Sequence, residues 1–414
     1  MRSQPVHQRA LRVAPQDGEV ATAAGLSTPE FRLLVACSWQ PPEADQTRTA
    51  GLIRQLCNEA PLNWDAFLGL VRRHQVSGLV QKALQKAGTG NVPPAFAQSL
   101  NDLSGAEALR ALRVAVESGR LCRAFAAEGL AMVPLKGVVL SWQLFGDPTV
   151  RQAGDVDLMI RPETLEAADS LLTQMGYRCQ VPRASLARLR SHGYECSYWN
   201  EFTRLSVDLH WRHELWTATQ TGDLWEHCHS KVWSGTSIQC LQGDALLLFL
   251  CDHGAKHRWS RLKWLSDVAT LLAKPRLAPW SELLALAKRW DLEEPLAEAG
   301  WLLRCLYGIE LPTELMGGDI ASAKHASESI AAMLMTREEL VLAETQSGPW
   351  RNLRFLRRRR RALPWRTHLW NLLIQADDLQ QYPLPAAMVW LYYPLRPLLW
   401  FWRRYGRTSP APAL

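Results

Sequence analysis

Several signals that mark particular protein classes are missing from this sequence. Its nine cysteines include no Cys-x-x-Cys pair and their number is odd, which argues against a disulfide framework and against a thiolate zinc site. Residues 1–25 contain no apolar core of signal-peptide length. No internal repeat is present, and no low-complexity tract apart from one arginine run. We therefore expect a protein that stays in a reducing cytoplasm.

What the chain does contain is typical of a folded globular protein. It has 414 residues, of which 47% are hydrophobic and 21% are charged, enough for two or three domains. The formal net charge of +7 and the pI near 9.0 indicate an anionic partner, which leaves a nucleotide, a nucleic acid and a membrane surface open.

Hydrophobic periodicity divides the chain into helical and mixed regions. Apolar residues recur at helical spacing in the N-terminal part, and again after residue 240. The region between them alternates short strands with helices. The predicted organisation is a disordered leader at 1–27, a helical N-terminal region at 28–129, a catalytic core at 130–238, a helical domain at 239–345 and a basic, aromatic segment at 346–414.

The predicted core contains both element types at the lengths of a small α/β unit. "LAMVPL" and "DVDLMI" read as short buried strands, and "GVVLSWQLFG" between them reads as a helix that begins at Gly137. "ETLEAADSLLTQMG" predicts an amphipathic helix that ends at Gly176, followed by the strand-like runs "YRCQV", "YECSYW" and "RLSVDLHW". The fold class is therefore α/β (α+β), with a small mixed, mostly antiparallel sheet and helices on one side.

Two aspartates stand on one of these strands. Asp155 and Asp157 are two residues apart, so on a strand both side chains leave from the same face. Two such close negative charges repel each other unless a cation lies between them, and oxygen ligands favour a hard ion such as magnesium. "LSVDLHW" offers Asp208 as a third carboxylate on a neighbouring strand.

These segments, taken together and in this order, resemble the nucleotidyltransferases of the DNA polymerase β superfamily, in particular an uncharacterised bacterial nucleotidyltransferase-like branch. The resemblance runs from about Trp64 to Asp267. It is carried by "NWDAFLGLVRRHQVSGLV", "PLKGVVL", "RQAGDVDLMI", "VDLHW" and "HGAKHRWSRLKWLSDVA".

The resemblance implies a mechanism and a set of residues. Asp155 and Asp157 match the aspartates that hold divalent metals on the nucleotide's phosphates. Asp208 matches the third carboxylate, which helps to bind the metal that activates an acceptor hydroxyl. Two magnesium ions, for which manganese can substitute, would stabilise the attacking and leaving oxygens of an in-line displacement.

The sequence departs from the superfamily pattern at the start of the helix before the aspartates. Lys136-Gly137 replaces the usual glycine-serine pair. A helix N-terminus still offers backbone N–H groups to a phosphate, and glycine permits close approach. Lys136 and Arg151 would add positive charge toward a triphosphate. Phosphate binding is therefore expected, whereas the transferred group is left open between nucleotidyl and phosphoryl.

Histidines form a further group of candidate site residues. His253 and His257 are four residues apart and would share a helix face, but "HGAKH" lacks the glutamate of a zinc-protease motif. Together with Lys256 and Asp267 they are candidates for a cleft that faces the acceptor or the nucleotide. The remaining histidines in the vicinity are expected on loops near a phosphate site rather than as metal ligands: His210, His213, His227 and His229.

The C-terminal segment permits two interpretations. Arg357–Arg361 form a basic run, and "AMVWLYYPLRPLLWFW" follows it. Arg396 and the nearby prolines argue against a membrane-spanning helix, but a peripheral location in the membrane interface is compatible with the tryptophans. The alternative is a pair of C-terminal helices packed on the rest of the protein.

The sequence thus predicts a cytoplasmic enzyme, with contact to the inner membrane face left open. Its expected activity is magnesium-dependent transfer of a nucleotidyl group from a nucleoside triphosphate such as ATP to a hydroxyl. The acceptor is open among a saccharide, a small molecule, a peptide and a protein. A nucleic-acid partner is not expected, because no basic stripe with interleaved aromatics lies near the aspartates. The alternatives are a phosphoryl transferase of the same fold and a non-catalytic module that binds nucleotides or a partner.

Overall fold

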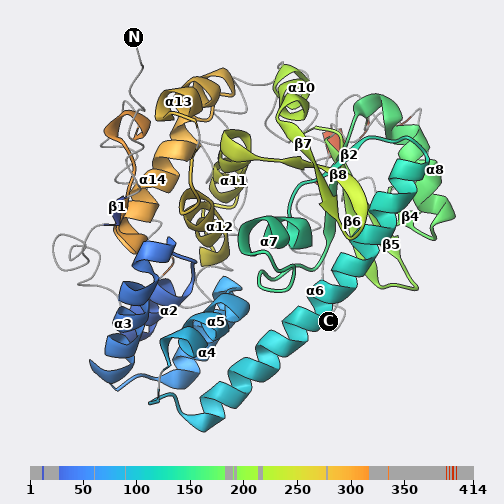
Figure 1. Ribbon diagram of the computed structural model, residues 1–414. Helices are drawn as coiled ribbons and strands as arrows, with labels where there is room; N and C mark the ends of the chain where they lie inside the picture. The colour runs from blue at the N-terminus through green and yellow to red at the C-terminus, as the bar shows by residue number, and fades with distance from the viewer. Residues whose placement is uncertain are drawn as a thin grey trace.

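The computed structural model describes most of the chain between residues 28 and 316. The exceptions within this range are residues 60, 89, 182–189, 191–193, 213–217 and 277. Outside it the description covers residues 12–13 and the single positions 334, 388, 391, 394, 395 and 398. Figure 1 shows three groups of elements: N-terminal helices, a mixed sheet with its own helices, and a second group of helices.

The N-terminal helices begin and end where local chemistry requires it. The side chain of Asn63 accepts a hydrogen bond from the N–H of Ala66 and so caps one helix, which ends at Gln75 in the left-handed conformation. The next helix ends at Gly88, also left-handed. The continuous helical pattern of "NWDAFLGLVRRHQVSGLVQKALQKAG" is therefore divided between two helices. The elements of this group are α2 (Pro29–Cys37), α3 (Glu43–Glu59), α4 (Trp64–His74), α5 (Ser77–Ala87) and the long α6 (Pro94–Ala127).

The central sheet is mixed and mostly antiparallel, as predicted. Its strand order is β2-β3-β6-β5-β4, and only the β3–β6 pair is parallel. The strands are β2 (Met132–Pro134), β3 (Val156–Ile160), β4 (Arg178–Cys179), β5 (Glu195–Asn200) and β6 (Leu205–His210). Two helices interrupt their sequence: α7 (Gly137–Phe145), and α8 (Leu165–Gln174) after the short 3-10 turn η1 (Pro162–Thr164).

The two faces of this sheet differ in composition, because side chains alternate along each strand. One face is apolar and packs against α6, α7 and α8. It is formed by Val156, Leu158 and Ile160 of β3, Leu205, Val207 and Leu209 of β6, and Cys196 and Tyr198 of β5. Asp157 on β3 and Asp208 on β6 project to the opposite face. The alternation in "DVDLMI" and "LSVDLH" therefore assigns the carboxylates to the face that these three helices leave free.

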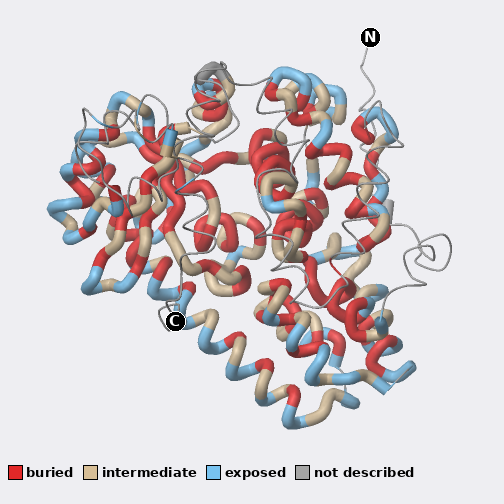
Figure 2. Tube along the Cα trace, turned by 180° about the vertical axis from the view of Figure 1, so that it is seen from behind, coloured by how far each residue is buried: buried red, intermediate tan, exposed pale blue. Residues whose placement is uncertain are grey.

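The second helical group packs into a separate apolar core with the N-terminal helices. Figure 2 shows that α11 and α12 are buried along most of their length. The apolar run "ALLLFLC" in α11 explains this, because a helix that is hydrophobic all round has to be enclosed. The elements are α10 (Ala218–Glu226), α11 (Gly243–Lys256), α12 (Leu262–Leu272), α13 (Trp280–Arg289), α14 (Glu293–Tyr307), β9 (Ile309–Glu310) and η2 (Thr313–Leu315).

Some elements differ from the sequence-based expectation. A hairpin of β7 (Cys228–Trp233) and β8 (Thr236–Leu241) follows α10 and was not predicted. Within the expected disordered leader, β1 (Arg12–Val13) pairs with β9, and the rest of 1–27 lies outside the described residues. The arginine run and most of the C-terminal aromatic segment also lie outside them. Among the helices that the structure describes, none combines the length and the apolar character needed to cross a bilayer.

Candidate active site

The three predicted carboxylates meet at the parallel strand pair. Asp157 is the second residue of β3, and its register partner on β6 is Asp208. Adjacent strands lie about 4.8 Å apart, so the two carboxylates are neighbours on one face. Asp155 lies directly before β3 rather than on it, because strand pairing begins at Val156. The expectation that both aspartates of the D-x-D pair stand on one strand is therefore correct only for Asp157.

Asp157 is the most enclosed of the three, and two cationic side chains reach it. Its side chain is 6% exposed, Lys136 Nζ lies 3.0 Å from its Oδ1, and His210 Nε2 lies 3.1 Å from the same oxygen. Burial alone would raise the pKa of Asp157, but the charge of Lys136 and the hydrogen bond from His210 outweigh it and lower the pKa. Asp157 is consequently ionised at neutral pH.

His210 bridges two carboxylates. Its Nδ1 lies 3.0 Å from Oε2 of Glu195, its register partner on β5. Burial would lower the pKa of His210, but the hydrogen bonds to Asp157 and Glu195 raise it to about 9. The imidazolium therefore donates from both nitrogens and fixes the orientation of Asp157. His210 belongs to the run "RLSVDLHW", which was predicted as a strand, and it is the last residue of β6; its placement on a loop with the other histidines was wrong.

Asp155 and Asp208 carry the surplus negative charge of the site. Burial and the neighbouring Asp157 carboxylate raise the pKa of Asp155. Burial also raises the pKa of Asp208, and Asp157 adds to the shift, although Ser197 Oγ donates a 2.6 Å hydrogen bond to Asp208 Oδ1. A raised carboxyl pKa means that the ionised form is unfavourable as the site stands. A cation bound between these groups would relieve that repulsion.

The carboxylate oxygens of the site are suitable ligands for magnesium. In the structure, however, the cationic side chains of Lys136 and His210 contact Asp157. Carboxylate oxygens are the ligands that magnesium prefers. Within the described part of the chain, however, no three His, Cys, Asp or Glu side chains converge as metal ligands. Lys136 Nζ takes the position of a counter-ion beside Asp157. Metal binding to Asp157 would therefore require the lysine ammonium to move away from its Oδ1.

The start of α7 lies beside the carboxylates. Lys136 is the N-cap residue and Gly137 the first helical residue, as predicted. Gly137 has a φ of +66°, which favours glycine, and a Cβ there would lie 3.4 Å from the backbone oxygen of Asp155. The helix N-terminus with its free N–H groups thus contacts the segment that carries the D-x-D pair.

Arg151 and Asp267, which were predicted for two different roles, form one buried pair. Arg151 Nε donates to Asp267 Oδ1 at 3.0 Å and to Oδ2 at 2.8 Å, and the side chains are 6% and 2% exposed. Asp267 therefore holds Arg151 instead of lining an open cleft. Lys263, one helical turn before Asp267 on α12, lies in the same electrostatic environment. Burial and the charge of Arg151 lower the pKa of Lys263 to about 7.

The predicted cleft histidines are packed against aromatic rings. His257 stacks on Trp264 with ring centroids 4.8 Å apart, and His253 meets His257 edge-on at 4.6 Å. Burial, together with nearby lysines, lowers the pKa of both, that of His257 to about 3, so both rings are neutral. Lys256 Nζ lies 5.5 Å from the ring centroid of Tyr194, the residue before β5.

The other predicted histidines are dispersed. His229 lies on β7 and was expected on a loop. His227, directly after α10, packs edge-on against Trp290 at 5.5 Å. His213 lies outside the described residues. No cluster of these histidines forms within the described part of the chain.

A hollow of the structure lies elsewhere. It is a cavity of about 270 Å³ lined by α2, α3, α5 and the end of α7, and none of the site carboxylates lines it. It approaches the site only through Val150, the neighbour of Arg151. The carboxylates remain the stronger candidate site, because Asp157 and Asp208 are in register on neighbouring strands and polar groups with shifted pKa values are more specific than concavity.

Sequence reasoning missed Glu195, Ser197 and Lys263. Glu195 and Ser197 alternate on β5 and oppose His210 and Asp208 in the β5–β6 register. The alternation in "YECSYW" was a usable signal for a polar face. Lys263 lies four residues before Asp267, a spacing that indicates a shared helix face.

Comparison with known proteins agrees with this architecture. Residues 60–308, more than half of the 414-residue chain, match the family model described as an uncharacterised nucleotidyltransferase. No curated protein and no solved structure matches the chain. The matched region spans α4 to α14 and includes all three carboxylates and the start of α7. The chain therefore belongs to this uncharacterised nucleotidyltransferase family.

Proposed function

We propose that the protein transfers a nucleotidyl group from a nucleoside triphosphate to a hydroxyl of an acceptor, in a magnesium-dependent reaction. Membership of a nucleotidyltransferase family supports nucleotidyl transfer in general. The observation that carries the finer proposal is the in-register pair Asp157 and Asp208 on parallel strands, with Asp155 held against the N-terminus of α7. Acidic groups and phosphate-binding N–H groups are thereby adjacent, which is the arrangement that a metal–triphosphate complex needs.

Each side chain receives a role from its contacts. Asp155, Asp157 and Asp208 would hold magnesium, which when bound supplies charge neutralisation for the phosphates and for the attacking oxygen. His210 and Glu195 keep Asp157 ionised and oriented. Lys136, once displaced from Asp157, would turn toward the triphosphate. Gly137 allows a phosphate to approach the helix N-terminus, and Lys263 adds positive charge behind Asp155.

Product analysis tests the proposal without knowledge of the acceptor. Water can take the place of the acceptor hydroxyl, so the purified protein with magnesium and ATP should slowly release AMP and pyrophosphate. Mass spectrometry and a pyrophosphate assay would detect them. The Asp157→Asn variant should release neither. Failure of all four common nucleoside triphosphates to yield a monophosphate, with and without a metabolite extract, would contradict nucleotidyl transfer.

Phosphoryl transfer is the second candidate, and Lys136 is the observation behind it. Lys136-Gly137 stands where the superfamily pattern has a glycine-serine pair, and Lys136 Nζ lies 3.0 Å from Oδ1 of Asp157. A mobile ammonium at this place would contact a terminal phosphate as readily as an internal one. The same experiment separates the candidates, since this reaction yields ADP and phosphate, or an acceptor that is heavier by one phosphoryl group.

Binding measurements separate both transfer reactions from a non-catalytic module. Isothermal titration with ATP should show affinity that increases at least about tenfold when magnesium is present, because the carboxylates and the phosphates then share the cation. Asp155→Asn and Asp157→Asn should lose that increase. Should both variants bind ATP with magnesium as tightly as the unmodified protein does, the carboxylates do not form the metal site.

A further inference from the structure

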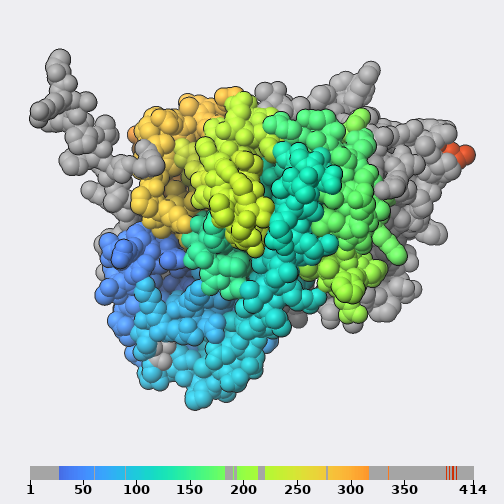
Figure 3. All heavy atoms as spheres, turned by 45° about the vertical axis from the view of Figure 1, so that its right-hand side comes forward, coloured from blue at the N-terminus to red at the C-terminus, as the bar shows by residue number. Residues whose placement is uncertain are grey.

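The long helix α6 presents an unusual surface. Its C-terminal half packs under the sheet, yet Leu109, Leu112 and Val116 on its outer side are 63%, 47% and 73% exposed. Among the described residues between 28 and 316, the other large hydrophobic side chains with high exposure are Phe202 and Val232. Phe202 lies in a turn that is hydrogen-bonded to α6, and Val232 lies on β7, whose partner strand β8 contacts α6. Figure 3 shows α6, cyan to teal, running along the surface of this face. Exposed apolar residues that gather on one face mark an interaction site more often than scattered ones do.

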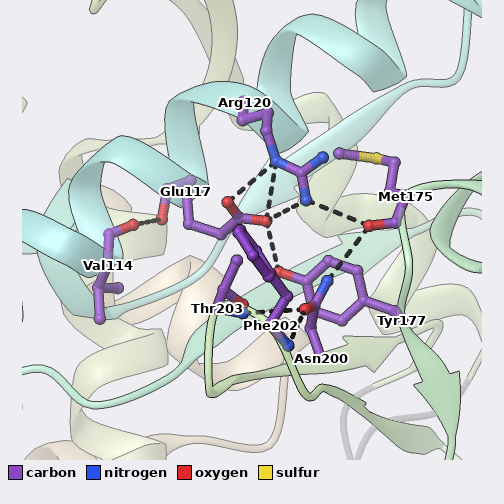
Figure 4. Close-up of polar contacts among 9 residues, drawn as sticks. Val114, Glu117, Arg120, Met175, Tyr177, Asn200, Phe202 and Thr203 are labelled. Atoms are coloured by element: carbon purple, nitrogen blue, oxygen red, sulfur yellow. Dashed lines mark hydrogen bonds and ion pairs between the residues drawn. The ribbon is translucent and has the colours of Figure 1, made fainter.

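Phe202 belongs to the same surface and is held in place. It lies 96% exposed in the turn between β5 and β6, and Arg113 Nη2 of α6 donates to the carbonyl oxygen of the next residue, Thr203, at 3.0 Å. Asn200 Oδ1 accepts from the N–H groups of Phe202 and Thr203 at 2.9 and 3.0 Å (Figure 4). A hydrogen-bonded turn therefore presents the ring beside the stripe of α6, the exposed outer side of the helix that carries Leu109, Leu112 and Val116. These bonds fix the backbone of the turn, and an exposed aromatic ring on such a turn is suited to be an interface anchor.

Hydrogen bonds also hold α6 in place on its inner side. Glu117 faces inward and accepts hydrogen bonds from Tyr177 at 2.7 Å and from Arg120 Nη2 at 2.6 Å, and Arg120 also reaches the carbonyl oxygen of Met175 (Figure 4). This network ties the helix to the end of α8 and to the sheet. The exposed stripe on the other side is therefore a fixed surface that can be recognised without rearrangement.

The charges on the stripe identify its partner. Asp102, Leu109, Val116 and Arg123 follow each other at intervals of seven residues and lie on one side of the helix. All four are exposed. These four positions therefore run from an acidic N-terminal end through two apolar residues to a basic C-terminal end. Arg113, which lies between Leu109 and Val116, is exposed and donates to the carbonyl oxygen of Thr203. A surface with this order is complementary to its own copy in the antiparallel orientation.

The spacing of these residues determines which side chains face each other in the antiparallel orientation. If two copies of α6 cross about a twofold axis so that Leu109 of one faces Val116 of the other, then Asp102 faces Arg123, because each lies seven residues further out. The twofold axis would pass near residues 112 and 113, which is where the Phe202 turn contacts α6. Both aromatic anchors would thus lie close to the axis and to the apolar part of the other copy.

We propose that α6 and the β5–β6 turn form a homodimer interface in which two copies of this chain pack their α6 helices antiparallel. The site carboxylates project from the opposite face of the sheet, so association leaves the site accessible. The exposed side chains of one helix and one turn form a small interface. We therefore expect a dissociation constant on the order of 10 µM.

Sedimentation equilibrium of the full-length protein between 1 and 200 µM tests the interface. We expect a monomer–dimer equilibrium for the unmodified chain. Leu109→Glu/Val116→Glu should weaken association at least thirtyfold, and Asp102→Arg and Arg123→Asp should each weaken it at least tenfold by placing like charges opposite each other. The decisive variant is Asp102→Arg/Arg123→Asp, which exchanges the charges and should restore the dissociation constant to within threefold.

Controls separate the interface from effects on folding. Glu282→Arg, a charge reversal on the remote helix α13, should leave association unchanged, and circular dichroism melts should show that every variant folds. The proposal is overturned if the unmodified chain is monomeric at 200 µM, if the glutamate variant associates normally, or if the double charge exchange fails to restore association. Monomeric protein that binds anionic vesicles through Leu109 and Val116 would also overturn it and assign the stripe to a lipid surface.

Discussion

Two carboxylates buried in the same α/β unit have similar partners and different surroundings. Asp157 contacts a lysine and a histidine, and Glu117 contacts an arginine and a tyrosine; the two residues are 6% and 5% exposed. Asp157 stands among further carboxylates, with Asp208 in register on the next strand. Glu117, on the other side of the sheet, ties α6 to neighbouring elements.

The comparison shows that burial of a carboxylate beside a cation is not in itself a sign of function. Such pairs also serve as structural ties, and they contribute little net stability. What distinguishes the surroundings of Asp157 is a surplus of neighbouring carboxylates: burial, and to a smaller extent the charge of Asp157, raise the pKa values of Asp155 and Asp208. A structural pair has no need of that surplus, whereas a cation site does.

The largest effect should follow from neutralising the surplus. Asp208→Asn keeps the shape and the hydrogen bond from Ser197 but removes one charge of the proposed metal site. Triphosphate turnover should fall roughly a thousandfold, about 4 kcal/mol of transition-state stabilisation, while unfolding changes little. Pyrophosphate release measures the first and urea titration the second. Asp223→Asn is the control and should retain turnover, because Asp223 lies on α10 and its carboxylate pairs with Arg289 of α13, whose side chain is 58% exposed. Turnover above about a tenth for Asp208→Asn would contradict the assignment.

The buried pair of Arg151 and Asp267 should respond in the opposite way, with stability affected most. Asp267→Asn leaves the Arg151 guanidinium enclosed without its counter-charge, which costs about 3–5 kcal/mol of unfolding free energy. Replacing both by Met and Leu should recover most of this loss, and urea titration measures both changes.

The double variant also tests the phosphate role predicted for Arg151. If Arg151 contacts phosphate, Arg151→Met/Asp267→Leu should fold well and still bind ATP with magnesium more weakly, by about tenfold or more. Unchanged ATP affinity in a stable double variant would limit Arg151 to a structural role.

Glu117→Gln should have a smaller effect, confined to stability. The glutamine keeps an acceptor for Tyr177 but loses the charge that faces Arg120, whose side chain is 42% exposed and therefore screened by solvent. We expect a loss of about 1–2 kcal/mol in unfolding free energy and unchanged turnover per folded molecule. Thermal unfolding measures the change in stability, and an activity assay at 20 °C measures the turnover per folded molecule. A turnover defect as large as that of Asp208→Asn would remove the contrast between the two carboxylates.

Much of this arrangement could be predicted from the sequence because it depends on local patterns. The alternation in "DVDLMI" and "LSVDLH" identified both strands and placed Asp157 and Asp208 on polar faces, and Gly137 marked the start of a helix. The pairing of Arg151 with Asp267 could not be predicted, since 116 residues separate them and only tertiary packing joins them. The β7–β8 hairpin was missed although Ser234-Gly235 stands between two alternating runs, a recognisable turn signal.

Two buried histidines also differ in their partners, and this difference predicts how the stability of the fold depends on pH. His210 has two carboxylate partners and a pKa raised to about 9. His74 is fully buried, and its Nδ1 accepts the N–H of Leu262 at 3.1 Å; burial, and next the charge of Arg73, lower its pKa to about 3. Because the unfolded chain binds a proton on His74 near pH 6.5 and the folded protein does not, His74 destabilises the fold as the pH decreases below about 6.5.

Between pH 7 and 5.5 this contribution amounts to about 1 kcal/mol of unfolding free energy. His74→Gln keeps an acceptor for Leu262 without a titrating ring, so the stability of this variant should decrease less over that interval, by about the same amount. Urea titrations at both pH values measure the difference of slopes, in which the contributions of His253 and His257 cancel. Equal slopes would show that the pKa of His74 is not lowered in the folded protein. Burial would then not determine the pKa of His74. The contrast between a buried histidine without carboxylate partners and His210, which has two, would disappear.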